Sequence, residues 1–180
     1  YIKSQSSYLY VLEQSEGSRC TKLSRYDSTT LDEKTIELLP YGGSRTSVWA
    51  LNCYASVDGM AVSADSVLCI GTTIDQSQYD NVTSDTPHNI YLTITPVSDF
   101  SKEATSVKYL TNYTGNGKSF MGVKITPITE NRFMISWEEY ENTDDSSSEN
   151  YASADDSLSS STLHYLFVDG KGNVLSREYT

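Results

Sequence analysis

The sequence contains little of what most enzymes and membrane proteins require. Only two histidines, His88 and His164, and three cysteines occur in 180 residues. Neither a Gly-x-Ser-x-Gly run nor a His-Glu-x-x-His run is present, so the common signatures of serine hydrolases and zinc proteases are missing. No apolar run approaches the roughly 20 residues of a membrane-spanning helix, which argues against membrane insertion.

Positive charge is also scarce. Thirteen Lys and Arg residues face 24 Asp and Glu residues, for a formal net charge of −11. Such a chain is repelled by a phosphate backbone and by an anionic lipid surface, so we expect neither nucleic acid nor membrane as a partner. Its partners are then expected among proteins or glycans.

The three cysteines have no metal-binding spacing. Cys20, Cys53 and Cys69 form no Cys-x-x-Cys pair, so no zinc site and no other metal site is predicted from them. Cys69 lies in an apolar run and is expected to be a buried free thiol. A bridge between Cys20 and Cys53 is open in a secreted chain.

Helical periodicity is nearly absent, and short runs rich in Thr, Tyr and β-branched residues recur between turn residues. This pattern predicts an all-β fold. The expected strands are Tyr8–Gln14, Arg19–Tyr26, Thr35–Leu39, Val48–Tyr54, Met60–Ser63, Val67–Asp75, Asn89–Thr95, Ser106–Leu110, Val123–Ile128, Arg132–Glu139, Thr162–Val168 and Val174–Tyr179.

The strands fall into three units of similar order, in residues 1–43, 44–117 and 118–180. Leu31 matches Phe100 at a distance of 69 residues, and Ile36 matches Val107 at 71. The second and third units each contain four strands, the second beginning with a long strand over Val48–Ser63. The first unit shows only three, because no strand is recognised before Tyr8. We therefore expect three antiparallel repeats in a single all-β region.

Four-stranded repeats that follow one another are typical of β-propeller blades. Three blades do not close a ring, since propellers use about 4–8. We therefore expect part of a β-propeller-like body, from a larger protein or completed by another chain or a missing segment. A β-sandwich is the alternative fold.

Several segments carry a resemblance to a known kind of repeat. They are Val62–Gln76, Ile90–Ile94, Tyr109–Tyr113, Val123–Ile125 and Arg132–Glu139, including the Leu-Thr-Asn-Tyr and Trp-Glu-Glu runs. Together they resemble the propeller-like C-terminal repeat region of large secreted or cell-surface bacterial proteins of unassigned function. The resemblance covers about residues 60–180 and contributes no catalytic motif. It implies an extracellular location.

An acidic insertion over Glu138–Asp156 departs from that resemblance. No Lys or Arg occurs between Phe133 and Gly170. Clustered carboxylates can bind Ca²⁺, although the EF-hand order of ligands is missing. A solvated Ser- and Asp-rich loop without any cofactor is the favoured interpretation.

The candidate binding residues are Trp49, Asp75, Glu138 and Glu139. Trp49 could stack on a sugar, and the carboxylates lie at equivalent strand ends. Trp137 alternates with Phe133 and Ile135, so it is expected to be buried with them. Asn81 and Asn112 begin possible glycosylation sequons. We expect a non-enzymatic extracellular module that binds a protein or glycan. The alternative is a glycoside-active β-propeller with Asp75 and Glu138 or Glu139 as paired carboxylates.

Overall fold

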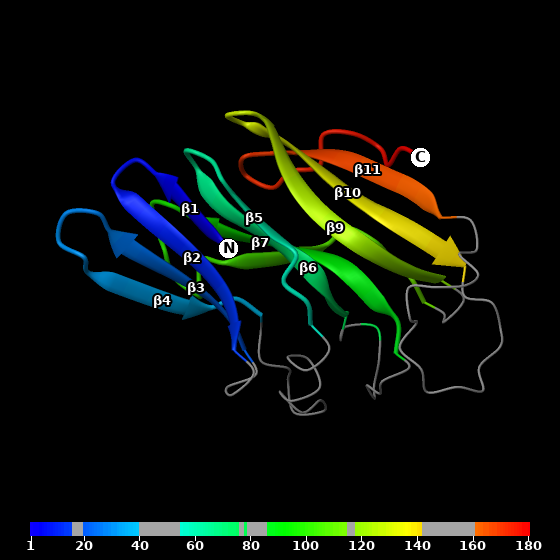
Figure 1. The fold of residues 1–180 in the computed structure, drawn as a ribbon, viewed down its shortest axis with the longest axis horizontal. Coiled ribbons are helices and arrows are strands. Elements are labelled where there is room, and N and C mark those ends of the chain that lie inside the picture. The colour runs from blue at the N-terminus through cyan, green and yellow to red at the C-terminus, as the bar shows by residue number, and fades with distance from the viewer. Residues whose placement is uncertain (16–19, 40–54, 76–77, 79–85, 115–117, 142–160) are drawn as a thin grey trace.

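The computed structural model describes the chain except for residues 16–19, 40–54, 76–77, 79–85, 115–117 and 142–160. Its described part contains eleven β-strands and no α-helix, and hence no helix that could cross a membrane. The strands form three antiparallel sheets that follow one another along the chain (Figure 1). The predicted all-β, antiparallel class is thereby confirmed.

Sheet 1 contains four strands in sequence order: β1 (Ile2–Gln5), β2 (Tyr8–Ser15), β3 (Cys20–Asp27) and β4 (Glu33–Glu37). The expectation that the first unit lacks its first strand is wrong. β1 pairs with β2 through Ile2 opposite Val11 and Gln5 opposite Tyr8. Backbone pairing rather than burial holds β1 in place, because its residues are exposed except for the half-buried Gln5.

Sheet 2 contains β5 (Gly59–Val62), β6 (Ser66–Ile74), β7 (His88–Pro96) and β8 (Ser106–Tyr109), again in sequence order. Its two central strands are buried along almost their whole length. The long strand expected over Val48–Ser63 is shorter, because among the described residues only β5 pairs with β6. Residues 48–54 of that expected strand lie outside the described residues.

Sheet 3 contains β9 (Lys118–Thr129), β10 (Arg132–Glu141) and β11 (Thr162–Asp169), with β10 in the middle. The fourth strand expected over Val174–Tyr179 is not a strand. Only two bridges join this segment to β11, at Val168–Val174 and Tyr165–Tyr179. Between them the Phe167 N–H donates to the Ser176 hydroxyl (3.1 Å) instead of a backbone carbonyl, which interrupts the ladder.

Sheet 2 is packed on both faces. On one face, Val67 and Cys69 lie in a core with Tyr10, Leu12 and Leu23 of sheet 1. On the other face, Leu68 and Ile70 lie in a core with the sheet 3 residues Val123, Phe133, Ile135, Trp137, Leu166 and Val168. Side chains that alternate along β6 therefore serve opposite neighbours, which explains why its burial shows no two-residue period.

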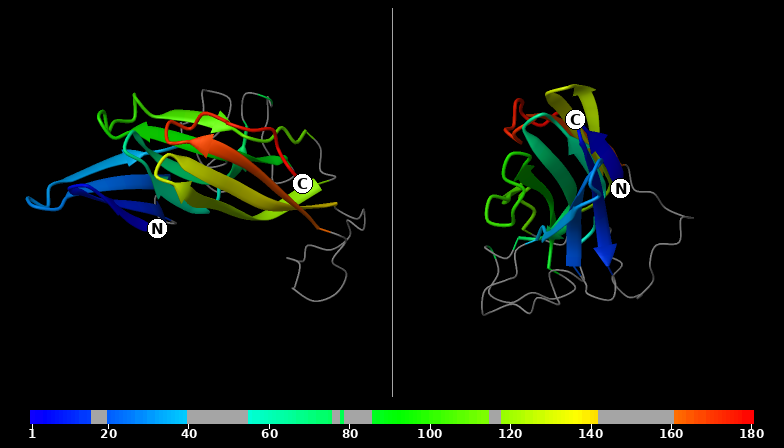
Figure 2. Two further views of the ribbon diagram at one scale, coloured as in Figure 1. Left: turned by 90° about the horizontal axis from the view of Figure 1, so that it is seen from above. Right: turned by 90° about the vertical axis from the view of Figure 1, so that its left-hand side faces the viewer.

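The first strands of the three sheets lie next to one another. β5 contacts β1 on one side and β9 on the other, whereas β4 and β8 lie at the far edges of their sheets. Two further views show the sheets successively stacked from the β1 end of the molecule to the β11 end (Figure 2). Three stacked sheets differ from the two layers of a β-sandwich.

Candidate functional site

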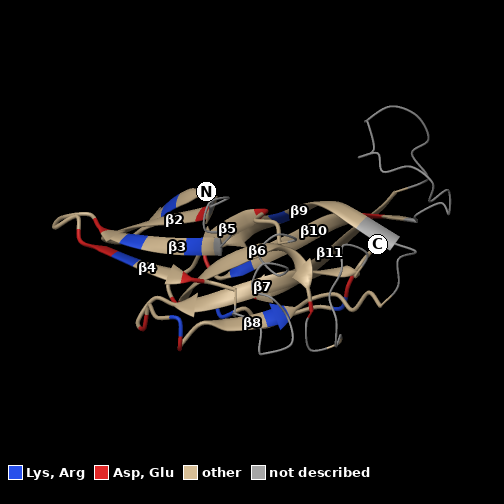
Figure 3. Cartoon of the chain, turned by 90° about the horizontal axis from the view of Figure 1, so that it is seen from below, with Lys and Arg blue, Asp and Glu red and all other residues tan. Residues whose placement is uncertain are grey.

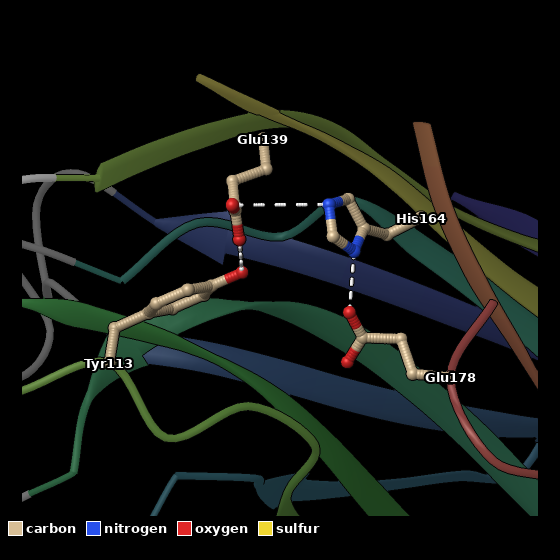
Figure 4. A network of polar contacts seen from close by, with 4 residues as sticks. All are labelled: Tyr113, Glu139, His164 and Glu178. Atoms are coloured by element: carbon tan, nitrogen blue, oxygen red, sulfur yellow. Dashed lines mark hydrogen bonds and ion pairs between the residues drawn. The ribbon is translucent and has the colours of Figure 1, made fainter. Parts of the chain in front are cut away.

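A polar cluster lies at the edge of the core between sheets 2 and 3 (Figure 4). It consists of four residues from separate parts of the chain. Glu139 lies on β10 and His164 on β11, Tyr113 lies in the connection that follows β8, and Glu178 lies in the C-terminal segment. We call these four residues the polar cluster.

Strand alternation places Glu139 in the cluster. Phe133, Ile135 and Trp137 are at most 1% exposed and face the core, as predicted, and Glu139 follows on the same face at 9% exposed. Glu138 points to the opposite face and is exposed. The two neighbouring candidate carboxylates therefore belong to different surfaces, and only Glu139 lies in a buried polar site.

The hydrogen bonds of the cluster join sheet 3 to its neighbours. The Tyr113 hydroxyl donates to Glu139 Oε2. His164 Nδ1 lies 2.5 Å from Glu178 Oε1, and because a carboxylate accepts, this nitrogen carries the proton. His164 Nε2 lies 4.0 Å from Glu139 Oε1. The cluster thus fastens the β8–β9 connection to β10 and the C-terminal segment to β11.

The surroundings of Tyr113 favour its neutral form. Burial, reinforced by the hydrogen bond to the Glu139 carboxylate, raises the pKa of the Tyr113 hydroxyl well above its ordinary value. The nearby Trp137 indole N–H partly offsets this rise in the pKa. Tyr113 therefore remains a hydrogen-bond donor at neutral pH, which suits positioning rather than proton transfer.

Two buried nitrogens beside Glu139 have no hydrogen-bond partner in the described part of the chain. They are Nε1 of Trp137 and Nε2 of His164. The two rings are stacked, with centroids 5.5 Å apart and an interplanar angle of 17°. Buried polar atoms of this kind are commonly satisfied by an ordered water molecule. The cluster includes no side chain in the role of an activated nucleophile.

Asp75 lies at the end of β6 in a second polar contact chain. Its carboxylate accepts a hydrogen bond from Gln78 Nε2 (2.8 Å), and the same amide nitrogen donates to Asn112 Oδ1 (2.9 Å). Asn112 is the residue before Tyr113 of the polar cluster and is exposed. Asp75 is 8% exposed, so it is largely used within the fold.

The other predicted site residues lie outside the described residues or have separate roles. Trp49, Asn81 and Cys53 are outside, as is the acidic insertion beyond Glu141. The Cys20–Cys53 bridge that the sequence leaves open and the calcium alternative are therefore not tested by the described residues. Cys69 is a buried free thiol, as predicted, and burial raises its pKa to about 12. In the described part of the chain no three His, Cys, Asp or Glu side chains are grouped as metal ligands.

Sequence reasoning missed Tyr113, His164 and Glu178. For His164 a signal was available, because it alternates with Leu166 and Val168 and so faces the core with them. For Tyr113 and Glu178 no local signal exists, since both lie outside the strands and meet the cluster only in the folded chain.

The chain was compared with protein families, curated proteins and solved structures. No family model matches the chain, and a search of curated proteins finds no match. A solved structure of an acylaminoacyl peptidase in complex with Z-Gly-Gly-Phe-chloromethyl ketone is similar with a TM-score of 0.48 and 10% sequence identity. The match covers 99% of this chain and 25% of the peptidase chain. The fold and the site together define an all-β protein of three antiparallel sheets with a partly buried polar cluster.

Proposed function

We propose that this chain is a non-enzymatic binding or scaffold module, built as part of a β-propeller-like body. The order of the sheets carries the proposal. Each sheet follows the previous one along the chain, the first strands β1, β5 and β9 adjoin, and the middle sheet is buried on both faces. In a β-propeller, each blade is one sheet, and the sheets likewise follow one another around a central axis.

The positions of the candidate carboxylates support a role without catalysis. Hydrolysis of a glycoside by paired carboxylates requires two such groups that face one open site. Asp75 and Glu139 are both largely buried and accept hydrogen bonds from Gln78 and Tyr113. Glu138 faces away from Glu139 on the other side of β10. The Tyr113–Glu139 contact joins the connection after β8 to β10 of sheet 3, and the Asp75 contacts join the connections that follow β6 and β8 of sheet 2.

Two hollows in the described surface suggest where a partner binds. A cavity of about 100 Å³ lies where the first strands meet and is lined by Lys3, Ser4, Met60, Ala61, Val62, Pro127 and Phe133. A hollow of about 430 Å³ between β4 and the turn after β7 is lined by Lys22, Lys34, Thr35, Ile36, Glu37, Ser101, Lys102 and Glu103. Pockets for small molecules commonly measure about 300–1,000 Å³.

The larger hollow is therefore the proposed binding site. Its size admits a sugar ring or a short peptide, and its mixture of lysines and glutamates offers donors and acceptors to a polar ligand. The smaller cavity suits a single apolar side chain of a protein partner. Figure 3 shows the charged bands on β3 and β4, in contrast to the uncharged length of β7.

A location outside the cell is part of the same proposal. It is supported by the acidic, Ser- and Thr-rich composition and by the exposed Asn112 in an Asn-x-Thr sequon. Detection of the protein in the culture medium or on the surface of intact cells would support this location. Its recovery only from the cell interior would contradict it.

The experiment that tests the proposed function combines a glycan array and a peptide array with the folded chain. We expect a ligand whose binding weakens about tenfold or more in Lys34→Ala and persists in Lys171→Ala, because Lys171 is exposed but does not line the hollow. Blank arrays would contradict binding and leave the scaffold role. Hydrolysis of a glycoside panel that disappears in Asp75→Ala and Glu138→Ala would overturn the non-enzymatic role itself.

A further inference from the structure

The outward face of sheet 3 is unusually apolar for a surface. The residues that alternate with the buried Ile135 and Leu166 point away from the core, and they include Met134, Tyr165 and Phe167. Leu163 on the same face is 57% exposed, and Met121 opposite Glu138 is 58% exposed. Tyr179 extends this surface by stacking on Tyr165 at 5.1 Å. We call this surface the outer face of sheet 3.

This face also carries positive charge in a strongly acidic chain. Lys124 of β9, Arg132 of β10 and Arg177 beside Tyr179 are exposed there. Two carboxylates, Glu138 and Asp169, lie on the same face. Asp169 is tied into its own turn by hydrogen bonds from the Lys171 N–H, the Asn173 N–H and the Asn173 side chain.

The outward face of sheet 1 has the opposite character. Strand register places Ile2, Leu9 and Val11 together on β1 and β2, away from the buried Tyr10 and Leu12. Ile2 is 65% exposed and Leu9 38%. The same face carries Glu13 on β2 and, at the β4 edge, Glu33 and Glu37, and Lys22 is the one cation that the described residues of this face show. We call this surface the outer face of sheet 1.

We propose that two copies of this chain associate head to tail, with the outer face of sheet 3 of each packed on the outer face of sheet 1 of the other. This inference rests on the proposed propeller-like order of the sheets. The two contacts are equivalent under a two-fold axis and join six sheets in a closed ring. Six lies within the range of about 4–8 blades that propellers use.

The distribution of charge favours this pairing over the symmetric ones. Two outer faces of sheet 3 in contact would bring Lys124, Arg132 and Arg177 against the same cations, and two outer faces of sheet 1 would bring glutamates together. In the head-to-tail pairing, inner strands meet inner strands. Arg177, at the far edge of sheet 3, then meets Glu33 and Glu37 at the far edge of sheet 1. Like charges in contact disfavour wrong pairings, and opposite charges fix the register.

The apolar parts of the two faces supply the affinity. The strip of Ile2, Leu9 and Val11 on β1 and β2 would cover Met121 and Met134 on β9 and β10. Burial of exposed apolar area is the main favourable contribution to association, and the charged residues form a rim around it. The same contact would also cover the exposed apolar side chains on both outer faces, which otherwise meet water.

Sedimentation equilibrium of the 180-residue chain tests the proposal. We expect a species of twice the chain mass that dissociates on dilution, with a dissociation constant raised about tenfold or more in Leu163→Arg. Leu31→Arg is the matched control, because Leu31 is 74% exposed in the β3–β4 turn and lies on neither outer face. A monomer at every concentration overturns the proposal. A series of ever larger polymers also overturns it, because a head-to-tail contact that does not close into a ring forms an open filament.

A charge exchange distinguishes this contact from other dimers. Arg177→Glu alone and the pair Glu33→Lys with Glu37→Lys alone should each weaken the dimer, and all three changes in one chain should restore it. Equal dimerisation of all the variants overturns the head-to-tail assignment. Because Lys22 and Glu37 also line the larger hollow, the charge-exchange variants are compared by sedimentation alone. For the wild-type chain, a dimer with blank arrays contradicts only ligand binding, and a monomer that binds on the arrays contradicts only the ring.

Discussion

Replacement of Glu139 by alanine should destabilise the fold, whereas the same change at the neighbouring Glu138 should not. Glu139 is buried at the boundary of sheets 2 and 3 and accepts the hydrogen bond of the Tyr113 hydroxyl. Alanine removes this acceptor and also the carboxylate that faces His164 Nε2 at 4.0 Å. Glu138 is exposed on the opposite face of the same strand, so it provides a control matched in sequence position and chemistry.

The structure sets the size of the effect. A partly buried hydroxyl left without its acceptor costs about 1–3 kcal/mol, and the space vacated by the side chain adds to this cost. We expect Glu139→Ala to lower the free energy of unfolding by about 2–4 kcal/mol. Glu139→Gln keeps a carbonyl oxygen for Tyr113, so its cost should be about 1 kcal/mol or less. Glu138→Ala should stay within about 0.5 kcal/mol of the wild type.

Urea denaturation at one fixed protein concentration measures these differences. The midpoint should fall in the order Glu138→Ala, Glu139→Gln, Glu139→Ala, with an unchanged dependence of the free energy on urea concentration. Equal midpoints for the two alanine variants would refute the assignment of Glu139 as a buried joint. A second readout is the tyrosine absorbance titration, in which loss of the Glu139 carboxylate should lower the pKa of Tyr113.

Three further predictions concern sheet 2. Gly71→Ala should destabilise the fold by about 2–5 kcal/mol, because the new methyl group would lie 2.0 Å from the Ser56 carbonyl oxygen. The same oxygen accepts a hydrogen bond from the Tyr91 hydroxyl. Thermal unfolding measures the effect, and a melting temperature like that of the wild type would contradict this packing. Burial raises the pKa of Cys69 and of Tyr109 to about 12 from ordinary values of 9.0 and 10.0. The stability that the two buried neutral groups contribute is therefore complete below pH 9 and is lost as the pH rises toward 12. The urea midpoint should fall over that interval, and a midpoint that does not change with pH would count against burial. In a Cys20→Ser, Cys53→Ser chain, the thiol of Cys69 should react with a thiol reagent only as fast as the protein unfolds, and rapid labelling of the native protein would show that the site is open.

Much of sheets 2 and 3 could be predicted from the sequence. Val67–Asp75 differs from β6 by one residue at each end, and Arg132–Glu139 extends by two residues in β10. Apolar side chains with a two-residue period place Phe133, Ile135 and Trp137 on one face, and their burial confirms it. Local alternation suffices for β10 because, within one chain, one face of sheet 3 is packed on sheet 2 and the other face meets solvent.

β1 could not be predicted in the same way. Its residues Ile2, Lys3 and Ser4 are all exposed, so no buried face marks the strand. It exists because β2 offers an edge with free backbone groups, and the register from Ile2–Val11 to Gln5–Tyr8 satisfies them. The opposite error at Val174–Tyr179 has a related cause, since Ser176 replaces a backbone partner with its side chain.

The polar cluster shows a third limit. Alternation could assign Glu139 and His164 to the core side of β10 and β11, but their partners Tyr113 and Glu178 lie in irregular segments. A pairing between residues that are 26 positions apart depends on how two sheets pack, which no local pattern encodes. Asp75 and Glu139 are held within the fold by hydrogen bonds from Gln78 and Tyr113, and these partners became visible only in three dimensions.

In the proposed ring the three sheets are successive blades of a propeller-like body, and a second copy of the chain supplies the other blades. A crystal structure of the 180-residue chain in its associated form is the decisive measurement. We expect two chains and six sheets around a two-fold axis, with β1, β5 and β9 of each chain innermost and Arg177 beside Glu33 and Glu37 of the other. A lone chain whose sheets 1 and 3 both face solvent, or a dimer joined through other surfaces, would contradict it.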